Sequence, residues 1–466
     1  MVFSSLVFIC IFLPLVFLLH LILPTIQMKN VVLIFASLLF YAYGEPIYVL
    51  LMIGSTIVNY ILGRWIDLKQ KKYTIVVAVF INLFVLGIFK YADMVVLTVN
   101  QLFKTEFATP GISLPIGISF FTFQIMSYVI DVYRKDVEVQ KDYWKLLLYI
   151  SFFPQLIAGP IIKYHDVELQ ISNRSVSAEK IAKGFRRFIV GLSKKVLISN
   201  MVALTVDQIF ALELTNINIF TAWIGALAYL LQIYYDFSGY SDMAIGLGYM
   251  FGFNFMENFR YPYGSRTIQE FWRRWHISLS TWFKEYLYIP LGGNRYGRFR
   301  TCINKMIVFF STGLWHGANW TFVVWGLYHG MFLLMEEVVP IKKLPKILGH
   351  IYTIIVVTCG FVIFRAETIS QGMHIIVKMF TGFNMTPDLM YIAFRYCTPL
   401  FVFSLIIGLF GSFAWKEKAE LYIAKKSESV RNRVEYTTYG IGLVLLILCM
   451  LSLSSGTYNP FIYFRF

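Results

Sequence analysis

Three histidines lie in the stretches of the chain that are richest in tryptophan. His276 lies in RRWHISLS, and His316 and His329 lie in LWHGANWTFVVWGLYHG. A neutral imidazole titrates near physiological pH, so it can take a proton from an attacking hydroxyl group. In an apolar segment, a strongly polar side chain usually faces a bundle interior or a wet cavity. The three histidines are therefore the first candidates for chemistry.

Three kinds of chemistry can be weighed for these side chains: metal binding, proton relay and general-base catalysis. His316 and His329 are thirteen residues apart, which is about 220° around a straight helix, so one helix cannot present both to one ion. No HExxH motif or carboxylate cluster accompanies them, and no metal site is predicted. A proton relay needs intramembrane acids, for which Asp236 and Asp242 are the candidates. In general-base catalysis by His316, Asn319 would share its helical face and orient it or hold an oxyanion.

Each candidate also has a purely structural interpretation. His276 borders an apolar stripe and could bond to lipid headgroups or to a loop carbonyl. His329 could serve packing or hydrogen bonding, and buried acids such as Asp236 and Asp242 are usually paired. The residues alone do not decide between these interpretations.

The composition indicates the medium in which these residues work. Of the 466 residues 58% are hydrophobic and 14% are charged, whereas a soluble domain carries about 25% charged residues. Lipid is therefore expected to cover most of the surface, which excludes soluble globular classes. The net charge of +15 fits cytoplasmic loops that face anionic lipid, so no nucleic acid partner is expected. The five cysteines are scattered and suggest no disulfide framework.

Apolar runs recur along the chain and predict an all-α polytopic membrane protein of about ten to twelve transmembrane helices, with interfacial and re-entrant helices. The predicted spans are 5–24, 31–43, 46–66, 73–90, 143–162, 219–235, 303–314, 318–338, 347–364, 391–411 and 437–454. The first lacks a charged n-region and a cleavage site, so we expect a retained helix. Residues 114–133 open with Pro115 and Gly117 and predict a short or re-entrant span, which hints at an internal cavity. No internal repeat is visible, so residues 1–466 are predicted to form one membrane-embedded domain.

Two elements must position the histidines. Residues 266–290 have apolar residues at steps of three and four, which predicts one amphipathic helix lying in the membrane interface. Residues 311–330 are predicted to be the catalytic helix region. Its Gly313/Gly317 and Gly326/Gly330 pairs favour close approach of neighbouring backbones.

The stretch FWRRWHISLSTWFKEYLYIPLGGNR followed by GLWHGANWTFVVWGLYHG resembles the membrane-bound O-acyltransferases. It is most similar to the bacterial branch that O-acetylates exopolysaccharides such as alginate. The similarity extends to LPIGISFFTFQ, FFPQLIAGPI, YYDFSGYSDMAIGLG and the terminal NPFIYFRF, and so to essentially the whole chain. The resemblance implies a helical membrane fold around a central tunnel, with His316 catalytic and His276 as the second characteristic histidine. The residues then expected to support the site or line the tunnel are Trp315, Asn319, Asp236, Asp242 and His329.

The resemblance also implies a reaction. An acetyl group is expected to pass from a cytoplasmic thioester, acetyl-CoA, across the bacterial plasma (inner) membrane for O-acetylation of a cell-surface or secreted polysaccharide, without a bound cofactor. Arg273, Arg274 and Lys284 could pair with the donor's phosphates. An extracytoplasmic SGNH-type acetyltransferase is the expected partner. The alternatives are D-alanyl transfer from a carrier protein to teichoic acid, and a transporter or scaffold subunit of a polysaccharide export complex.

Overall fold

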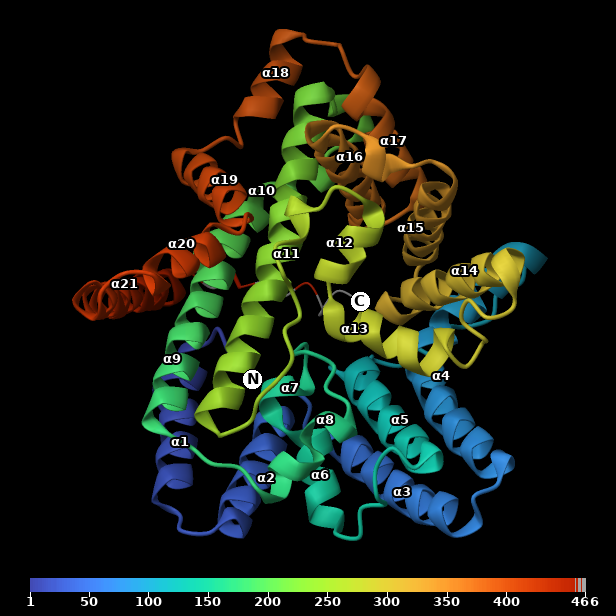
Figure 1. Cartoon of the computed structure of the whole chain (residues 1–466). Helices are drawn as coiled ribbons and strands as arrows, with labels where there is room; N and C mark the ends of the chain where they lie inside the picture. Colours follow the sequence, from blue (N-terminus) through green and yellow to red (C-terminus); the bar gives the residue numbers. More distant parts are fainter. Residues whose placement is uncertain (457, 460–461, 463–466) are drawn as a thin grey trace. The chain divides into compact units, whose positions relative to one another are not determined.

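The computed structural model describes residues 1–456, 458, 459 and 462, and all regular secondary structure in them is helical. Of the terminal motif NPFIYFRF, all but Asn459 and Ile462 lie outside the described residues. The chain forms two compact units, residues 1–188 with 241–256 and residues 189–240 with 257–466. The all-α expectation is confirmed (Figure 1). That residues 1–466 act as one domain stays a prediction.

The first unit is built around one almost completely buried helix. Its helices are α1 (Leu13–Ile22), α2 (Ile26–Ala42), α3 (Tyr48–Lys69), α4 (Lys72–Phe103), α5 (Ile118–Arg134), α6 (Tyr143–Ser151), α7 (Phe153–Leu156) and α8 (Tyr164–Ser172). Helices α3, α4 and α8 pack against α5, whose residues 118–129 are all buried (Figure 1). Asn59 on α3 and Asn82 on α4 exchange side-chain hydrogen bonds of 3.0 and 2.7 Å. Such amide pairs join helices where water cannot compete.

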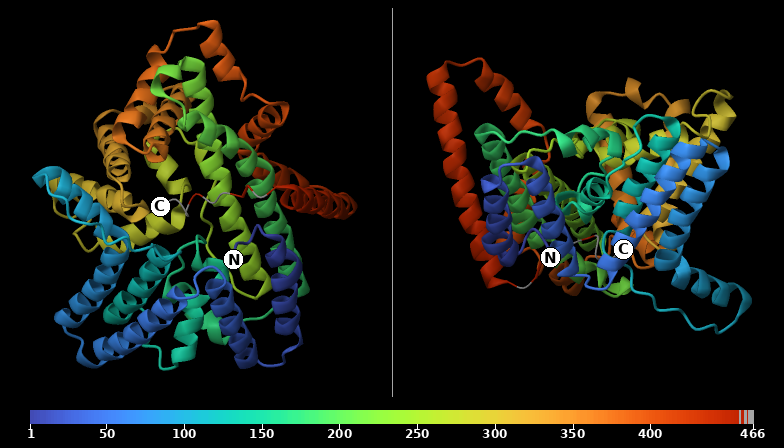
Figure 2. Two further views of the ribbon diagram at one scale, coloured as in Figure 1. Left: turned by 180° about the vertical axis from the view of Figure 1, so that it is seen from behind. Right: turned by 90° about the horizontal axis from the view of Figure 1, so that it is seen from below.

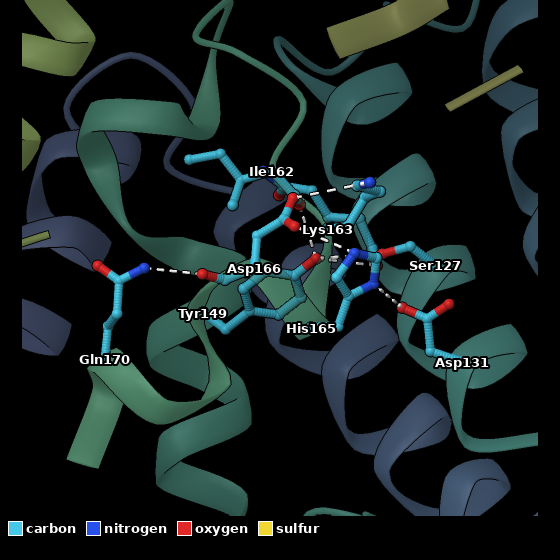
Figure 3. A network of polar contacts seen from close by, with 9 residues as sticks. Ser127, Asp131, Tyr149, Ile162, Lys163, His165, Asp166 and Gln170 are labelled. Atoms are coloured by element: carbon cyan, nitrogen blue, oxygen red, sulfur yellow. Dashed lines mark hydrogen bonds and ion pairs between the residues drawn. The ribbon is translucent and has the colours of Figure 1, made fainter. Parts of the chain in front are cut away.

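A polar network joins α5, α6 and α8 (Figure 3). Tyr149 on α6 donates to the carbonyl of Ile162 at 2.8 Å. On α8, the Nδ1 atom of His165 lies 3.1 Å from Asp131 Oδ2, and its Nε2 atom lies 3.0 Å from Asp166 Oδ1. The network anchors the irregular stretch 157–163, which is buried along its whole length. Non-helical backbone in a membrane protein needs such protein surroundings.

The second unit holds the two elements that were expected to position the histidines. Its helices are α10 (Asn200–Phe210), α12 (Ile268–Arg274), α13 (Ile277–Phe283), α14 (Gly297–His316), α15 (Trp320–Val338), α16 (Lys346–Arg365), α17 (Ile369–Thr381), α18 (Pro387–Phe394), α19 (Pro399–Gly411), α20 (Trp415–Ala424) and α21 (Glu428–Ser455). Helices α9 (Ala178–Ser193) and α11 (Ile219–Met250) contribute to both units. Helices α14 and α15 cross at Gly313 and Gly326, where a Cβ atom would collide with the carbonyls of Phe322 and Phe309. The predicted close approach at these glycines is confirmed.

Within the described residues, five helices are long and apolar enough to cross a membrane, and the bent pair α18–α19 adds a sixth if it is one span. The five are Tyr48–Lys69, Lys72–Phe103, Ala178–Phe210, Lys346–Arg365 and Glu428–Ser455. The protein is therefore multi-pass, with fewer helices of spanning length than the ten to twelve expected. Several predicted spans are short or divided: residues 143–162, for example, fold as α6, α7 and an irregular stretch.

Helix α21 has few contacts with its own unit. Only 6% of its apolar window is buried, and Cys449 is the buried residue on it. Figure 2 draws α21, in red, as one long helix. Its composition and exposure suit contact with lipid on almost every side.

Candidate active site

Residues 266–290 do not form the single helix that the sequence predicted. Helices α12 and α13 are separated at His276, whose φ of 44° places its backbone in the left-handed region. The preceding segment binds both sides of this break. Arg260 N–H donates to Arg274 O, and Ile277 N–H donates to Asn258 O, each at 2.9 Å. The helix ends because a neighbouring segment satisfies the backbone groups that an unbroken helix would pair internally.

The aromatic stripe of this element faces protein rather than the membrane interface. Phe271, Trp272 and Trp275 are buried in the hydrophobic core of the second unit. Helix α12 packs against α15 and α16. The single amphipathic helix is therefore corrected to two short helices with a buried aromatic face, because the same apolar stripe can pack into a core as well as into lipid. Its position at the membrane interface stays a prediction.

His276 is buried, which excludes the interpretation as a headgroup ligand. Its Nδ1 atom lies 3.3 Å from the Oδ1 atom of Asn258, which also accepts from the Ser278 N–H at 3.2 Å. Because Oδ1 is an acceptor, Nδ1 of His276 is the donor and Nε2 carries the lone pair. Burial, and then the neighbouring His316, lowers the pKa of His276 well below its usual range. Among the described residues Nε2 has no hydrogen-bond partner. The geometry thus presents a neutral imidazole with an available acceptor atom.

His316 is the last residue of α14, so residues 311–330 form two helices rather than one. Gly317 is extended, and a Cβ atom there would overlap the Phe322 ring. Asn319 is the N-cap of α15: its Oδ1 accepts from the Thr321 N–H at 3.0 Å, and its Nδ2 donates to Glu367 O at 3.1 Å. The expectation that His316 and Asn319 share a helical face is wrong, because α14 ends at His316 and Asn319 caps the start of α15.

His276 and His316, which are forty residues apart in the sequence, lie close together in the structure. The ring centroids of His276 and His316 are 6.3 Å apart. Trp315 stands beside both, with centroid distances of 5.9 Å to His276 and 5.0 Å to His316. His316 is 6% exposed. Two imidazoles and an indole thus form one buried cluster.

His329 lies beside this cluster without touching His316. Its ring is 5.3 Å from Trp325 and 5.2 Å from Trp272, and the Trp325 ring is in turn 5.1 Å from His316. His329 is fully buried, and neither ring nitrogen has a hydrogen-bond partner among the described residues. Its contacts are therefore those of a packed aromatic ring.

Both candidate acids are paired with bases. Asp236 lies 2.5 Å from Lys195 Nζ and also accepts from the Ile462 N–H at 2.8 Å. In the first unit, Asp242 lies 2.8 Å from Arg187 Nη2. Sequence reasoning missed Lys195 as a site-region residue, although a lysine directly before the apolar residues 196–198 was a usable signal.

The three expected donor-binding bases differ in their surroundings. Arg273 and Lys284 are exposed. Arg274 forms an ion pair of 2.7 Å with Glu270, one turn earlier on α12. Within the described part of the chain, no group of three or more His, Cys, Asp or Glu side chains is placed to hold a metal ion.

Residues 138–366, which include both clustered histidines, match the model of the membrane-bound O-acyltransferase family. Over the full length of both proteins, the chain is 39% identical to a probable alginate O-acetylase of Pseudomonas putida. The chain belongs to the membrane-bound O-acyltransferase family. This acyltransferase is also 32% identical to a peptidoglycan O-acetyltransferase of Helicobacter pylori, over 100% of this chain and 98% of the relative. With a teichoic acid D-alanyltransferase of Bacillus subtilis it shares 26% identity over 54% of this chain and 69% of the relative.

Membership in the family makes the protein an enzyme, an O-acyltransferase, embedded in a membrane by several helices. The transporter and scaffold interpretations give way to this result. The family resemblance drawn from the paired histidine motifs is confirmed.

Proposed function

We propose that this acyltransferase moves an acetyl group from cytoplasmic acetyl-CoA across the membrane for O-acetylation of a cell-surface or secreted polysaccharide. The observation that carries the proposal is the buried cluster of His276 and His316 in a membrane protein of this family. Full-length similarity to proteins named for alginate and peptidoglycan O-acetylation favours acetyl transfer. The similarity to a D-alanyltransferase is lower and covers about half of the chain.

In this proposal His316 acts as the general base. It takes the proton of an acceptor hydroxyl while the new C–O bond forms and the thioester C–S bond breaks, and the proton then passes to the leaving thiolate. Alternatively, the imidazole holds the acyl group briefly as a nucleophile. His276, with its tautomer fixed by Asn258, is the second imidazole of the site.

Charged surfaces and partners complete the proposal. The exposed side chains of Arg273 and Lys284, with Arg274, would pair with the phosphates of acetyl-CoA. The acetyl group would then pass to an extracytoplasmic SGNH-type acetyltransferase, and from it to the polysaccharide. This route places the protein in the plasma (inner) membrane of a bacterium.

The test measures thioester turnover by the full-length protein in lipid nanodiscs, supplied with radiolabelled acetyl-CoA and a soluble hydroxyl acceptor. Loss of a general base costs roughly 100- to 10,000-fold in rate, so His316→Ala should abolish measurable release of CoA. His374→Ala is the matched control, because the His374 ring contacts the Leu214 carbonyl at 3.1 Å instead of the cluster. Unchanged turnover in His316→Ala would overturn the site. Turnover of a D-alanyl carrier-protein thioester but not of acetyl-CoA would overturn the proposal that acetyl-CoA is the donor.

A further inference from the structure

Large aromatic side chains from three helices surround the His316 ring. Trp325 of α15 lies 5.1 Å away, at 90° to the imidazole. Phe364, near the end of α16, lies 5.2 Å away in an edge-on orientation. With Trp315 at 5.0 Å, these centroid distances are those of aromatic rings in direct contact.

This wall of rings is itself tightly supported. Phe364 contacts Trp325 at 4.9 Å and Phe322 at 4.8 Å, and all three are buried. Phe322 in turn presses on Gly313 and Gly317, where even a methyl group would not fit. Close-packed interiors resist the insertion of additional atoms. Trp315, Trp325 and Phe364 therefore leave little space beside the imidazole, and they cannot easily move to create more.

We propose that Phe364 and Trp325 set the upper limit on the length of the acyl group that this enzyme accepts, and so restrict the donor to a two-carbon acyl thioester. The inference rests on the proposed function, in which the thioester carbonyl reaches His316. The alkyl end of that acyl group must then lie beside the rings that surround the imidazole. An acetyl group places one methyl there, whereas each further methylene must displace a ring.

The size of the effect follows from how pockets discriminate methylenes. One additional methylene in a hydrophobic pocket changes kcat/KM by roughly 10- to 200-fold. We therefore expect wild-type enzyme to prefer acetyl-CoA over butyryl-CoA, which carries two more methylenes, by at least about 100-fold. Truncation of Phe364 should open space for those methylenes and reduce this preference.

Helix α16 provides a matched control one turn earlier. Phe361 is as completely buried as Phe364, but its ring contacts Trp275 at 5.0 Å and lies 6.4 Å from Phe364. Phe361→Ala therefore removes the same volume from the same helix without removing a ring beside His316. The control separates a change in acyl selectivity from a general loss of packing.

The experiment measures kcat/KM of the full-length enzyme in nanodiscs with acetyl-, propionyl- and butyryl-CoA. In Phe364→Ala the ratio of acetyl to butyryl activity should fall at least about tenfold, and in Trp325→Phe it should fall in the same direction, while Phe361→Ala keeps the wild-type ratio. Where Phe364→Ala fails to fold, Phe364→Leu tests the same position with a smaller void.

An equal loss with all three donors in the Phe364 variants would overturn the inference and leave the proposed function standing. An equal fall of the ratio in Phe361→Ala would also overturn it. Absence of turnover of any of these thioesters by wild-type enzyme would instead overturn the proposed function, and the inference with it.

Discussion

Lys195 and Asp236 form an ion pair in the interior of the second unit, with Nζ and Oδ1 2.5 Å apart and their side chains 3% and 2% exposed. The next residue on α11, Phe237, has its ring 4.4 Å from that of His276. The ion pair therefore belongs to the packing that supports one of the two clustered histidines. A charge at this depth depends on its partner, because the protein interior solvates a lone ion poorly.

Removal of one member of this pair should destabilise the protein more than removal of both. Lys195→Ala leaves the Asp236 carboxylate buried without its cation, and we expect a loss of about 3–5 kcal/mol in the free energy of unfolding. The double variant Lys195→Met/Asp236→Leu removes both charges and should recover most of that loss. Thermal unfolding in detergent measures both, and additive losses in the double variant would contradict the prediction.

Asn258 should control activity through the tautomer of His276. Asn258→Leu removes the acceptor of the His276 Nδ1–H, so the ring is free to place its proton on Nε2. We expect kcat to fall by at least about tenfold. The Ser278 N–H also loses its acceptor, so the free energy of unfolding should fall by about 1–3 kcal/mol as well. Asn258→Asp keeps an acceptor oxygen and should retain most of the activity. An equal loss of kcat in both variants would show that Asn258 acts through some other contact.

The crossing of α14 and α15 should not tolerate a methyl group. Gly326→Ala forces a Cβ atom against the Phe309 carbonyl, and overpacking of this kind costs about 1–3 kcal/mol. Gly440→Ala on α21 is the control, since nothing lies within 4 Å of its Cβ position. Alanine favours a helix over glycine, so the control should be neutral or stabilising. Equal unfolding temperatures for the two variants would argue against the close crossing.

His165 should make the stability of the first unit depend on pH. Its hydrogen bond to Asp131, followed by that to Asp166, raises the pKa of His165 to about 10, against about 6.5 in an unfolded chain. A raised pKa stabilises the folded state fully below the unfolded value, and this contribution disappears as the pH rises through about 10.

His165→Gln should therefore lower the unfolding temperature most near pH 6. The difference from wild type should shrink steadily as the pH approaches 10. Unfolding scans at half-unit intervals of pH measure this difference. A difference that is constant with pH would show that the His165 ring acts by packing and not by charge.

The sequence predicted the parts of the site that depend on residue type and spacing. Gly313 and Gly326 were recognisable because small residues at helical spacing permit close crossing, and the two histidine motifs identified the family. The break at His276 was not predictable, because it depends on the segment around Asn258 that satisfies the freed backbone groups. Likewise, Asn319 could be recognised as a cap only once the end of α14 at His316 was known.

The sequence also did not determine whether an apolar helix face packs against lipid or against protein. The stripe containing Phe271, Trp272 and Trp275 fits a membrane interface and a protein core equally well, because both reward the burial of aromatic area. The partner of Asp236 was hidden for a similar reason. Lys195 precedes it by 41 residues, and nothing local indicates that the two meet.

The left-handed backbone at position 276 restricts what can replace the imidazole there. Glycine adopts this conformation without strain, and asparagine and aspartate tolerate it, whereas most side chains cost about 1–2 kcal/mol and β-branched ones more. Among all substitutions at position 276, bulky ones should therefore lose both activity, because the imidazole is absent, and stability, because the backbone is strained. Asparagine is the substitution that separates the two effects, since it keeps the bend while discarding the ring.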